Sequence, residues 1–345
     1  MHIPLKILSA VFAAGLIATA VSQEAPTGSS SEQSPDEQKA LSALKGTIKG
    51  TIVWSSSRSN PRHKLWTMSA DGTDPKQLTK GDNVDWFSRF SPDGNTVLFT
   101  RSKSGWAPES DAEVFDKWDI WTIKADGTDE KKVAESACWG TWRPTGDSIV
   151  FARGTKAFIK PLADGAETEL IDVSTVFKKG TYAQQPSLSP NGRFLAITLR
   201  GTMRETGIYD LQKKVWNQTG GGCQIAWFPN GKRLVRMNEG QGNGGTEVLS
   251  INIDDNGIPS EKITAVSLPK SVRFMDLPGR RSHEYFPKID NTGTYMIWCA
   301  TQTGHEHDIA DYEVYIWKLS DDAKKAVRLT FHSGNDRWPD LFVQQ

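Results

Sequence analysis

The stretch that decides the fold is Asn83–Ser102, which reads NVDWFSRFSPDGNTVLFTRS. An aromatic-rich segment and a β-branched segment flank a Ser-Pro-Asp-Gly turn, a pattern typical of two antiparallel strands. Variants of this turn recur along the chain, at Ser91–Gly94, Arg143–Gly146, Ser189–Gly192, Phe228–Gly231 and Asp290–Gly293. Because the period is close to the ~40–50 residues of a four-stranded propeller blade, the sequence predicts a ring of small sheets.

The amino-acid composition agrees with an all-β protein and does not indicate a strongly charged binding partner. The chain has 345 residues, with 30 Gly and 17 Pro for turns, and 41 basic residues balance 41 acidic residues. Without a net charge, no electrostatic field favours nucleic acid or an acidic membrane surface. We therefore expect no nucleic-acid partner.

The N-terminus has the pattern of a secretory signal. Lys6 precedes an apolar run over residues 7–20 that ends in Ala-Thr-Ala, a cleavage-site pattern. This run is shorter than the ~20 residues of a spanning helix, although a membrane anchor is the alternative. We predict a signal peptide over 1–20, no membrane span after cleavage, and a periplasmic or secreted protein. Residues 21–49, rich in Ser, Glu, Pro and Gln up to Gln38, are predicted to be a disordered leader.

Residues 50–345 are predicted to form a six-bladed β-propeller of four-stranded antiparallel blades. Five complete units follow one another from residue 83 onward, whereas the first unit, Thr51–Thr79, lacks its first strand. The segment Asn335–Phe342 has the pattern of such a strand and has nothing after it. We therefore expect the C-terminal strand to complete blade 1 and close the ring, which hides sheet edges that would otherwise promote aggregation.

Three segments carry a family resemblance: Leu65–Asp74, Phe90–Thr100 and Asp119–Asp129. They are similar to the WD40-like (PD40) repeats of the TolB-type propeller family, and the similarity extends over roughly Gly50 to Phe342. The resemblance implies six blades and the envelope location usual in that family. It does not extend to the N-terminal domain of TolB, because Gln23–Gly50 is too short for one, so a role in the Tol–Pal system is not implied. Function depends on sites and not on the fold, so the resemblance does not assign a function to this chain.

The first strand of each blade lines the central channel, and alternate residues on it face opposite sides. The charged residues on the channel-lining strands fall in blades 6, 1 and 2. Three acids among them, Glu284, Asp336 and Asp85, could converge at one mouth of the central channel. Carboxylates suit calcium or another divalent cation, or a cationic ligand group. The alternative is that each acid pairs with a nearby base. The predicted ligand-binding residues are Asp85, Arg89, Glu284, Lys288, Asp336 and Trp338.

A histidine-rich loop of blade 6 offers a second candidate site. His305 and His307 flank Glu306, and His283 lies near the start of the first strand of that blade. These are ligand types for zinc or a related metal, and loops of this kind often hold sites. The alternative is a solvated polar loop.

Other side chains give little chemistry. The chain has no Gly-x-Ser-x-Gly elbow that would present a nucleophile. Cys138, Cys223 and Cys299 are an odd set within strands, so we expect three buried small hydrophobes, although one disulfide is possible. Trp106, in a Pro-containing loop, is the best candidate for an exposed tryptophan that grips a sugar or peptide.

These observations favour an exported, non-catalytic propeller scaffold that binds an envelope protein or a glycan at the channel mouth. The alternative is a metal-dependent carbohydrate-active enzyme, similar to a lyase, that uses the histidines of blade 6.

Overall fold

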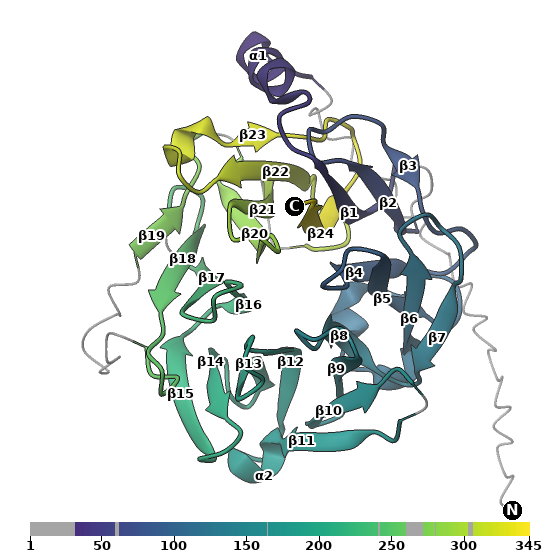
Figure 1. The fold of residues 1–345 in the computed structure, drawn as a ribbon, viewed down its shortest axis with the longest axis vertical. Coiled ribbons are helices and arrows are strands. Elements are labelled where there is room, and N and C mark those ends of the chain that lie inside the picture. Colours follow the sequence, from purple (N-terminus) through teal and green to yellow (C-terminus); the bar gives the residue numbers. More distant parts are fainter. Residues whose placement is uncertain are drawn as a thin grey trace, which may run out of the picture.

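The computed structural model describes residues 32–58, 62–163, 165–240, 242–259, 272–279, 281–302 and 306–345. These residues form six four-stranded antiparallel sheets arranged as a ring, so the predicted six-bladed propeller is confirmed (Figure 1). The predicted signal peptide lies outside the described residues. No helix among those described is long and apolar enough to cross a membrane.

Each of blades 2 to 6 contains four consecutive strands, with the first strand innermost (Figure 1). Blades 2 to 4 contain β4 (Asp85–Phe90), β5 (Thr96–Ser102), β6 (Trp118–Lys124), β7 (Lys131–Ala134), β8 (Cys138–Trp142), β9 (Ser148–Arg153), β10 (Lys156–Pro161), β11 (Thr168–Asp172), β12 (Thr181–Leu188), β13 (Phe194–Gly201), β14 (Glu205–Asp210) and β15 (Val215–Gly220). A short helix, α2 (Val173–Val176), connects blades 3 and 4.

Blades 5 and 6 continue the pattern, with β16 (Cys223–Trp227), β17 (Arg233–Glu239), β18 (Thr246–Asn252), β19 (Val272–Met275), β20 (His283–Ile289), β21 (Tyr295–Thr301), β22 (Glu313–Lys318) and β23 (Val327–Arg328). The fourth strand of blade 5 is thus β19. The strand that the sequence predicted at residues 261–268 lies outside the described residues.

The two ends of the chain close the ring within blade 1. The C-terminal strand β24 (Asp336–Val343) pairs antiparallel with β1 (Gly50–Ser56), followed by β2 (Lys64–Ser69) and β3 (Lys76–Gln77). The register places Thr51 opposite Phe342 and Val53 opposite Asp340. The predicted closure is therefore confirmed, and the inner edge of β1 is covered.

Every innermost strand contains one residue with a left-handed backbone at a break in its pairing register. These six residues, with φ between 53° and 62°, are Phe87, Trp139, Gln185, Gln224, Phe286 and Trp338. In each blade the register shifts there, as in a β-bulge. A left-handed conformation of a bulky residue costs of order 1–3 kcal/mol, so the surrounding ring must impose it.

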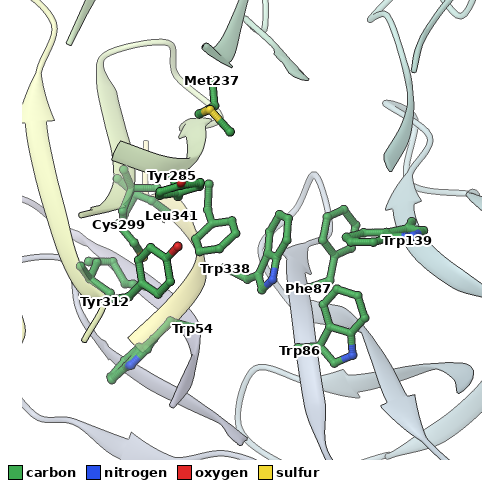
Figure 2. Close-up of a cluster of buried hydrophobic side chains, with 14 of the residues drawn as sticks. Trp54, Trp86, Phe87, Trp139, Met237, Tyr285, Cys299, Tyr312, Trp338 and Leu341 are labelled. Carbon is green, nitrogen blue, oxygen red and sulfur yellow. The ribbon is translucent and has the colours of Figure 1, made fainter. Parts of the chain in front are cut away.

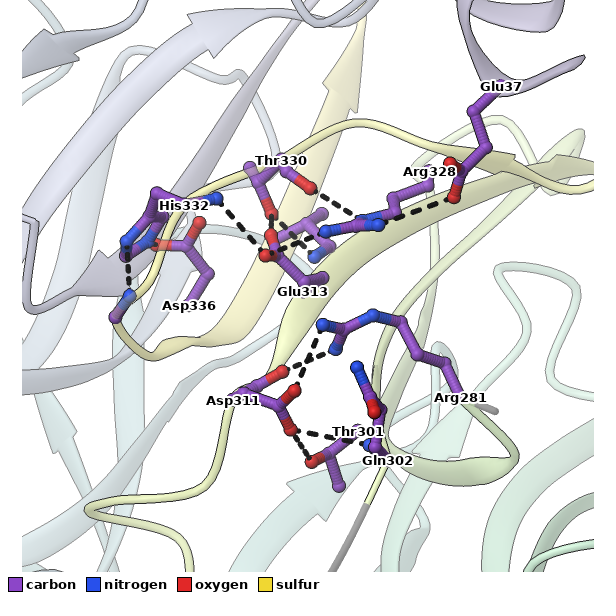
Figure 3. Close-up of polar contacts among 12 residues, drawn as sticks. Glu37, Arg281, Thr301, Gln302, Asp311, Glu313, Arg328, Thr330, His332 and Asp336 are labelled. Carbon is purple, nitrogen blue, oxygen red and sulfur yellow. Dashed lines mark hydrogen bonds and ion pairs between the residues drawn. The ribbon is translucent and has the colours of Figure 1, made fainter. Parts of the chain in front are cut away.

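The N-terminal leader contains a helix, which corrects the expectation of disorder over residues 35–44. The helix α1 (Pro35–Leu44) begins with a capping box, in which Glu37 N donates to Ser34 Oγ (3.2 Å) and Ser34 N donates to Glu37 Oε2 (2.8 Å). Glu37 also pairs with Arg328 of blade 6 at 3.3 Å (Figure 3). Local capping and this tertiary contact thus outweigh a polar composition.

Candidate functional site

Aromatic rings fill the channel at the level of the six left-handed residues. The ring of Trp338 lies 4.1 Å from that of Phe286 and 4.9 Å from that of Phe87, and Phe87 lies 5.0 Å from Trp139, between centroids. Trp86 packs behind them, 4.7 Å from Trp139 and perpendicular to it. Figure 2 shows Trp338 of β24, Phe87 and Trp86 of β4, and Trp139 of β8 lying close together. Edge-to-face packing of this kind adds to the stability gained by burial.

A cavity of about 600 Å³ lies on one side of this aromatic layer. Its floor is formed by Trp139, Gln185 and Gln224, which come from blades 3, 4 and 5. Tyr182 and Arg200 of blade 4 line its wall. We call it the mouth cavity, because the long loops between the second and third strands of blades 2 and 6 form its rim.

The roof of the mouth cavity is held together by Glu109, which joins the two loops to the ring. Its carboxylate accepts from Trp338 Nε1 (2.8 Å) and from Arg337 Nη1 (2.9 Å), and lies 2.7 Å from His307 Nδ1. Its own backbone N–H donates to Asp308 Oδ2 (2.9 Å). Burial opposes ionisation of Glu109, but His307 and Arg337 hold its pKa below the usual range. The carboxylate therefore stays charged at neutral pH and anchors the roof.

Each of the three side chains of the cavity floor contains a buried polar atom that has no hydrogen-bond partner among the described residues. These atoms are Trp139 Nε1, Gln185 Oε1 and Gln224 Nε2. The three side chains are 2%, 5% and 4% exposed, respectively. Gln224 Oε1 accepts from Phe286 N (2.5 Å), which orients the carboxamide and leaves its nitrogen as the unpaired end. Buried polar groups are usually paired, so this concentration on one surface is unusual.

The wall of the mouth cavity contains both basic and acidic side chains. Arg200 donates to the carbonyl oxygens of Leu199 and Gly222, each at 3.0 Å. Glu113 bonds to the side-chain amide of Gln184. Burial raises the pKa of Glu113 above its ordinary value. The cavity therefore combines donors, acceptors and aromatic faces, and its lining contains more carboxylates than guanidinium groups.

Two of the predicted acids are fully buried and paired with bases. Asp85 binds Arg101 through both carboxylate oxygens, at 2.6 and 3.0 Å. Asp336 lies 2.9 Å from His332 Nε2 and 3.0 Å from Arg58 Nη2. Although burial opposes ionisation of Asp336, His332 and Arg58 hold its pKa well below the usual range. The oxygens of both acids are thus engaged within the protein.

The remaining predicted ligand-binding residues lie in three different places. Glu284 is buried and accepts from Leu277 N (2.6 Å), while its Oε2 has no partner among the described residues. Burial raises the pKa of Glu284 to about 9. Trp338 belongs to the aromatic layer, and Arg89 and Lys288 line a smaller cavity on its far side. The six residues therefore do not form one mouth site.

The predicted histidine set is only partly described. His307 lies on the rim of the mouth cavity and bonds to Glu109. His283 begins β20 and is half-buried, and His305 lies outside the described residues. Within the described ranges, no three His, Cys, Asp or Glu side chains are grouped so that they could hold a metal ion.

Two further expectations are confirmed. Cys138, Cys223 and Cys299 are buried free thiols. Trp106 is 42% exposed at the rim of the mouth cavity, where Ile309 of the opposite loop is 36% exposed. Sequence reasoning missed Glu109 and Arg337, because their contact joins a loop of blade 2 to strand β24, 228 positions away in the chain.

Comparisons with known proteins support the fold. No protein-family model matches the chain. Uncharacterized protein Atu1656 of Agrobacterium fabrum (strain C58) is 27% identical over 142 residues, which are 37% of this chain and 44% of that protein. The match thus spans less than half the length of that curated relative.

Two solved structures have the same architecture. TolB from Acinetobacter baumannii aligns with a TM-score of 0.58 and 15% identity, over 88% of this chain and 69% of that one. A protein of Agrobacterium tumefaciens assigned as TolB aligns with a TM-score of 0.51 and 13% identity, over 83% of this chain and 90% of that one. The class of protein is thus a six-bladed β-propeller. Its particular fold is that of TolB proteins.

Proposed function

We propose that this protein is an exported, non-catalytic propeller that binds a polar segment of an envelope protein or glycan in the mouth cavity. One observation carries the proposal: three side chains that line the cavity, those of Trp139, Gln185 and Gln224, each contain a buried polar atom without a partner among the described residues. Its volume of about 600 Å³ lies within the roughly 300–1,000 Å³ typical of ligand pockets.

The chemistry of the floor favours a neutral polar ligand. Trp139 and Gln224 each offer an N–H donor, and Gln185 offers a carbonyl acceptor. An unpaired buried polar group costs about 1–3 kcal/mol, which a ligand that supplies both donors and acceptors recovers. Sugar hydroxyls and peptide amides both meet this requirement. The exposed Trp106 at the rim adds an aromatic face on which a sugar ring or an apolar side chain can pack.

The proposed location follows from the predicted signal peptide over residues 1–20. An exported protein meets envelope proteins and glycans, so a partner of either kind is available to it.

The test is a binding comparison between two single-residue variants. Gln224→Glu keeps the acceptor for Phe286 N but removes the amide donor from the cavity floor, whereas Gln218→Glu makes the same change at an exposed position of β15. Both proteins are tested on a glycan array and in pull-downs from envelope extract. We expect Gln224→Glu to weaken capture at least about tenfold, the usual effect of losing one hydrogen bond to a buried group, and Gln218→Glu to bind like wild type. Equal binding by both would reject the cavity as the site.

The alternative of a metal-dependent enzyme now depends on His305 joining His307 or His283. Metal analysis of the purified protein separates the two functions. Stoichiometric metal that is lost in His307→Ala would favour the enzyme, whereas a protein that takes up no metal on titration would reject it.

A further inference from the structure

The channel continues beyond the aromatic layer into a second, smaller cavity. Both cavities are lined by Gln185 and Gln224, so the layer of left-handed residues separates them. Arg89, Lys288 and Asp340 each follow a left-handed residue by two positions, in the first strands of blades 2, 6 and 1. These three charged residues form a layer of their own, on the side of the turns between first and second strands. This side is the opposite end of the channel from the mouth cavity.

The charges in this layer do not balance. Arg89 and Lys288 are two cations, and neither forms an ion pair with a carboxylate among the described residues. The carboxylate of Asp340 instead accepts from two backbone N–H groups, Phe90 N at 2.8 Å and Leu341 N at 3.1 Å. It acts on the two cations only at longer range. Buried charges in proteins are normally paired, because an isolated charge is costly to remove from water.

Arg89 is the more deeply placed of the two cations. Its side chain is 7% exposed and lies over the ring of Phe87, 4.1 Å from the centroid. Its guanidinium donates to Ser88 O at 2.6 Å. Burial lowers the pKa of Arg89 to about 10, with Asp340 opposing the shift, and also lowers the pKa of Lys288. Arg89 therefore remains charged at neutral pH and needs a counter-charge.

We propose that a monovalent inorganic anion of about the size of chloride binds between Arg89 and Lys288 at this end of the channel. The cavity they line has a volume of about 20 Å³, and one water-sized sphere needs roughly 10–15 Å³. That space is sufficient for one small ion. The ion would neutralise the excess positive charge and brace the inner strands of blades 6, 1 and 2. This site is separate from the mouth cavity, so either can fail without the other.

The first test uses bromide as the probe. Crystals of the full chain grown in sodium bromide should give an anomalous peak between Arg89 Nη and Lys288 Nζ. In solution, chloride should raise the unfolding temperature of wild type relative to gluconate at equal ionic strength. A protein with neither the peak nor the chloride effect would overturn the proposal. So would a site that takes acetate but not bromide, since that result would indicate a carboxylate ligand.

Two variants make opposite predictions. Lys288→Gln removes one cation and should weaken chloride binding about tenfold or more, as expected for loss of a charged hydrogen-bond donor. Asp340→Asn keeps an acceptor for Phe90 N but removes the competing negative charge, so it should tighten chloride binding several-fold. Lys318→Gln, at an exposed position of the same blade, is the matched control and should leave binding unchanged. A purely structural role of Asp340 predicts no tightening, and equal chloride affinity in Asp340→Asn and wild type would contradict the anion site.

Discussion

The two halves of the ring use the same strands for different purposes. In blades 6, 1 and 2, the first strands carry Glu284, Asp336 and Asp85 near their start, and all three are fully buried. At the corresponding positions blades 3, 4 and 5 carry small residues, namely Ala137, Ala183 and Gly222. The first half is filled by aromatic rings and by these acids, of which Asp85 and Asp336 are in ion pairs, and the mouth cavity lies over the second half. A repeated fold thus places its open space where the repeat carries its smallest side chains.

Gly222 shows why the second half depends on small residues. A Cβ atom added there would lie 2.1 Å from the carbonyl oxygen of Met237, and φ is +83°. Both the close backbone approach and the positive φ require glycine. The glycine at this position of blade 5 is therefore required by backbone packing.

The largest effect should come from removing the strand that closes the filled half. Deleting Asp336–Gln345 removes β24, uncovers the edge of β1 and takes away Arg337 and Trp338. We expect loss of cooperative unfolding, measured by circular dichroism on heating, because an open ring exposes apolar surface and unpaired strand edges. Deleting Gln344 and Gln345 alone leaves β24 whole and should be nearly neutral. A cooperative transition in the longer deletion would show that the ring does not need its C-terminal strand.

A smaller but still large effect is expected for Asp336→Ala. The change removes the carboxylate that balances the positive charges of His332 and Arg58. It should therefore reduce the free energy of unfolding by about 3–5 kcal/mol in urea titrations. The control is Asp82→Ala, whose ion pair with Arg62 is exposed. It should change stability by less than about 1 kcal/mol. Similar losses in the two variants would mean that burial of the charged pairs does not distinguish the filled half.

Glu109→Gln tests the link between the halves. The substitution keeps hydrogen-bonding capacity but removes the charge that binds Arg337, so we expect a loss of about 1–3 kcal/mol. Hydrogen exchange should accelerate in the loops that carry Glu109 and His307, and stay unchanged in the strands of blades 3 to 5. Unchanged exchange in both loops would contradict the role assigned to Glu109.

The pH dependence of stability should be the subtlest effect. Because burial raises the pKa of Glu284 to about 9 in the folded protein, the folded state retains a proton that the unfolded chain has released above its ordinary value. The free energy of unfolding should therefore fall as pH rises toward 9, by at most about 1.4 kcal/mol per pH unit from this group. In Glu284→Gln, urea titrations between pH 6 and 9 should show a flatter profile. An unchanged slope would mean that Glu284 is ionised in the folded protein.

The fold could be predicted from sequence because its signals are local and repeated. Each turn of the Ser-Pro-Asp-Gly type fixes one pair of strands, and Asn335–Phe342 could be aligned on the other first strands by its pattern. The capping box of α1 is equally local, since Ser34 and Glu37 are three residues apart. The polar composition of that segment, taken by itself, nevertheless predicts disorder.

The site was harder to predict because its geometry is imposed by the ring. Phe87 and Trp139 have no intrinsic preference for a left-handed backbone, so nothing in their local sequence marks the bulges. The contact of Glu109 with Arg337 joins residues 228 positions apart. The row of Ala137, Ala183 and Gly222 was visible in the sequence, but its meaning appears only once Asp85 and Asp336 of the other half are seen to be buried in ion pairs.

Hydrogen exchange with a bound ligand tests the central claim most directly. A glycan or peptide captured by the wild-type protein should slow exchange in β8, β12 and β16 and in the loop that carries Trp106, because these line the mouth cavity. Protection confined to β20, β24 and β4, with no change over blades 3 to 5, would contradict the account.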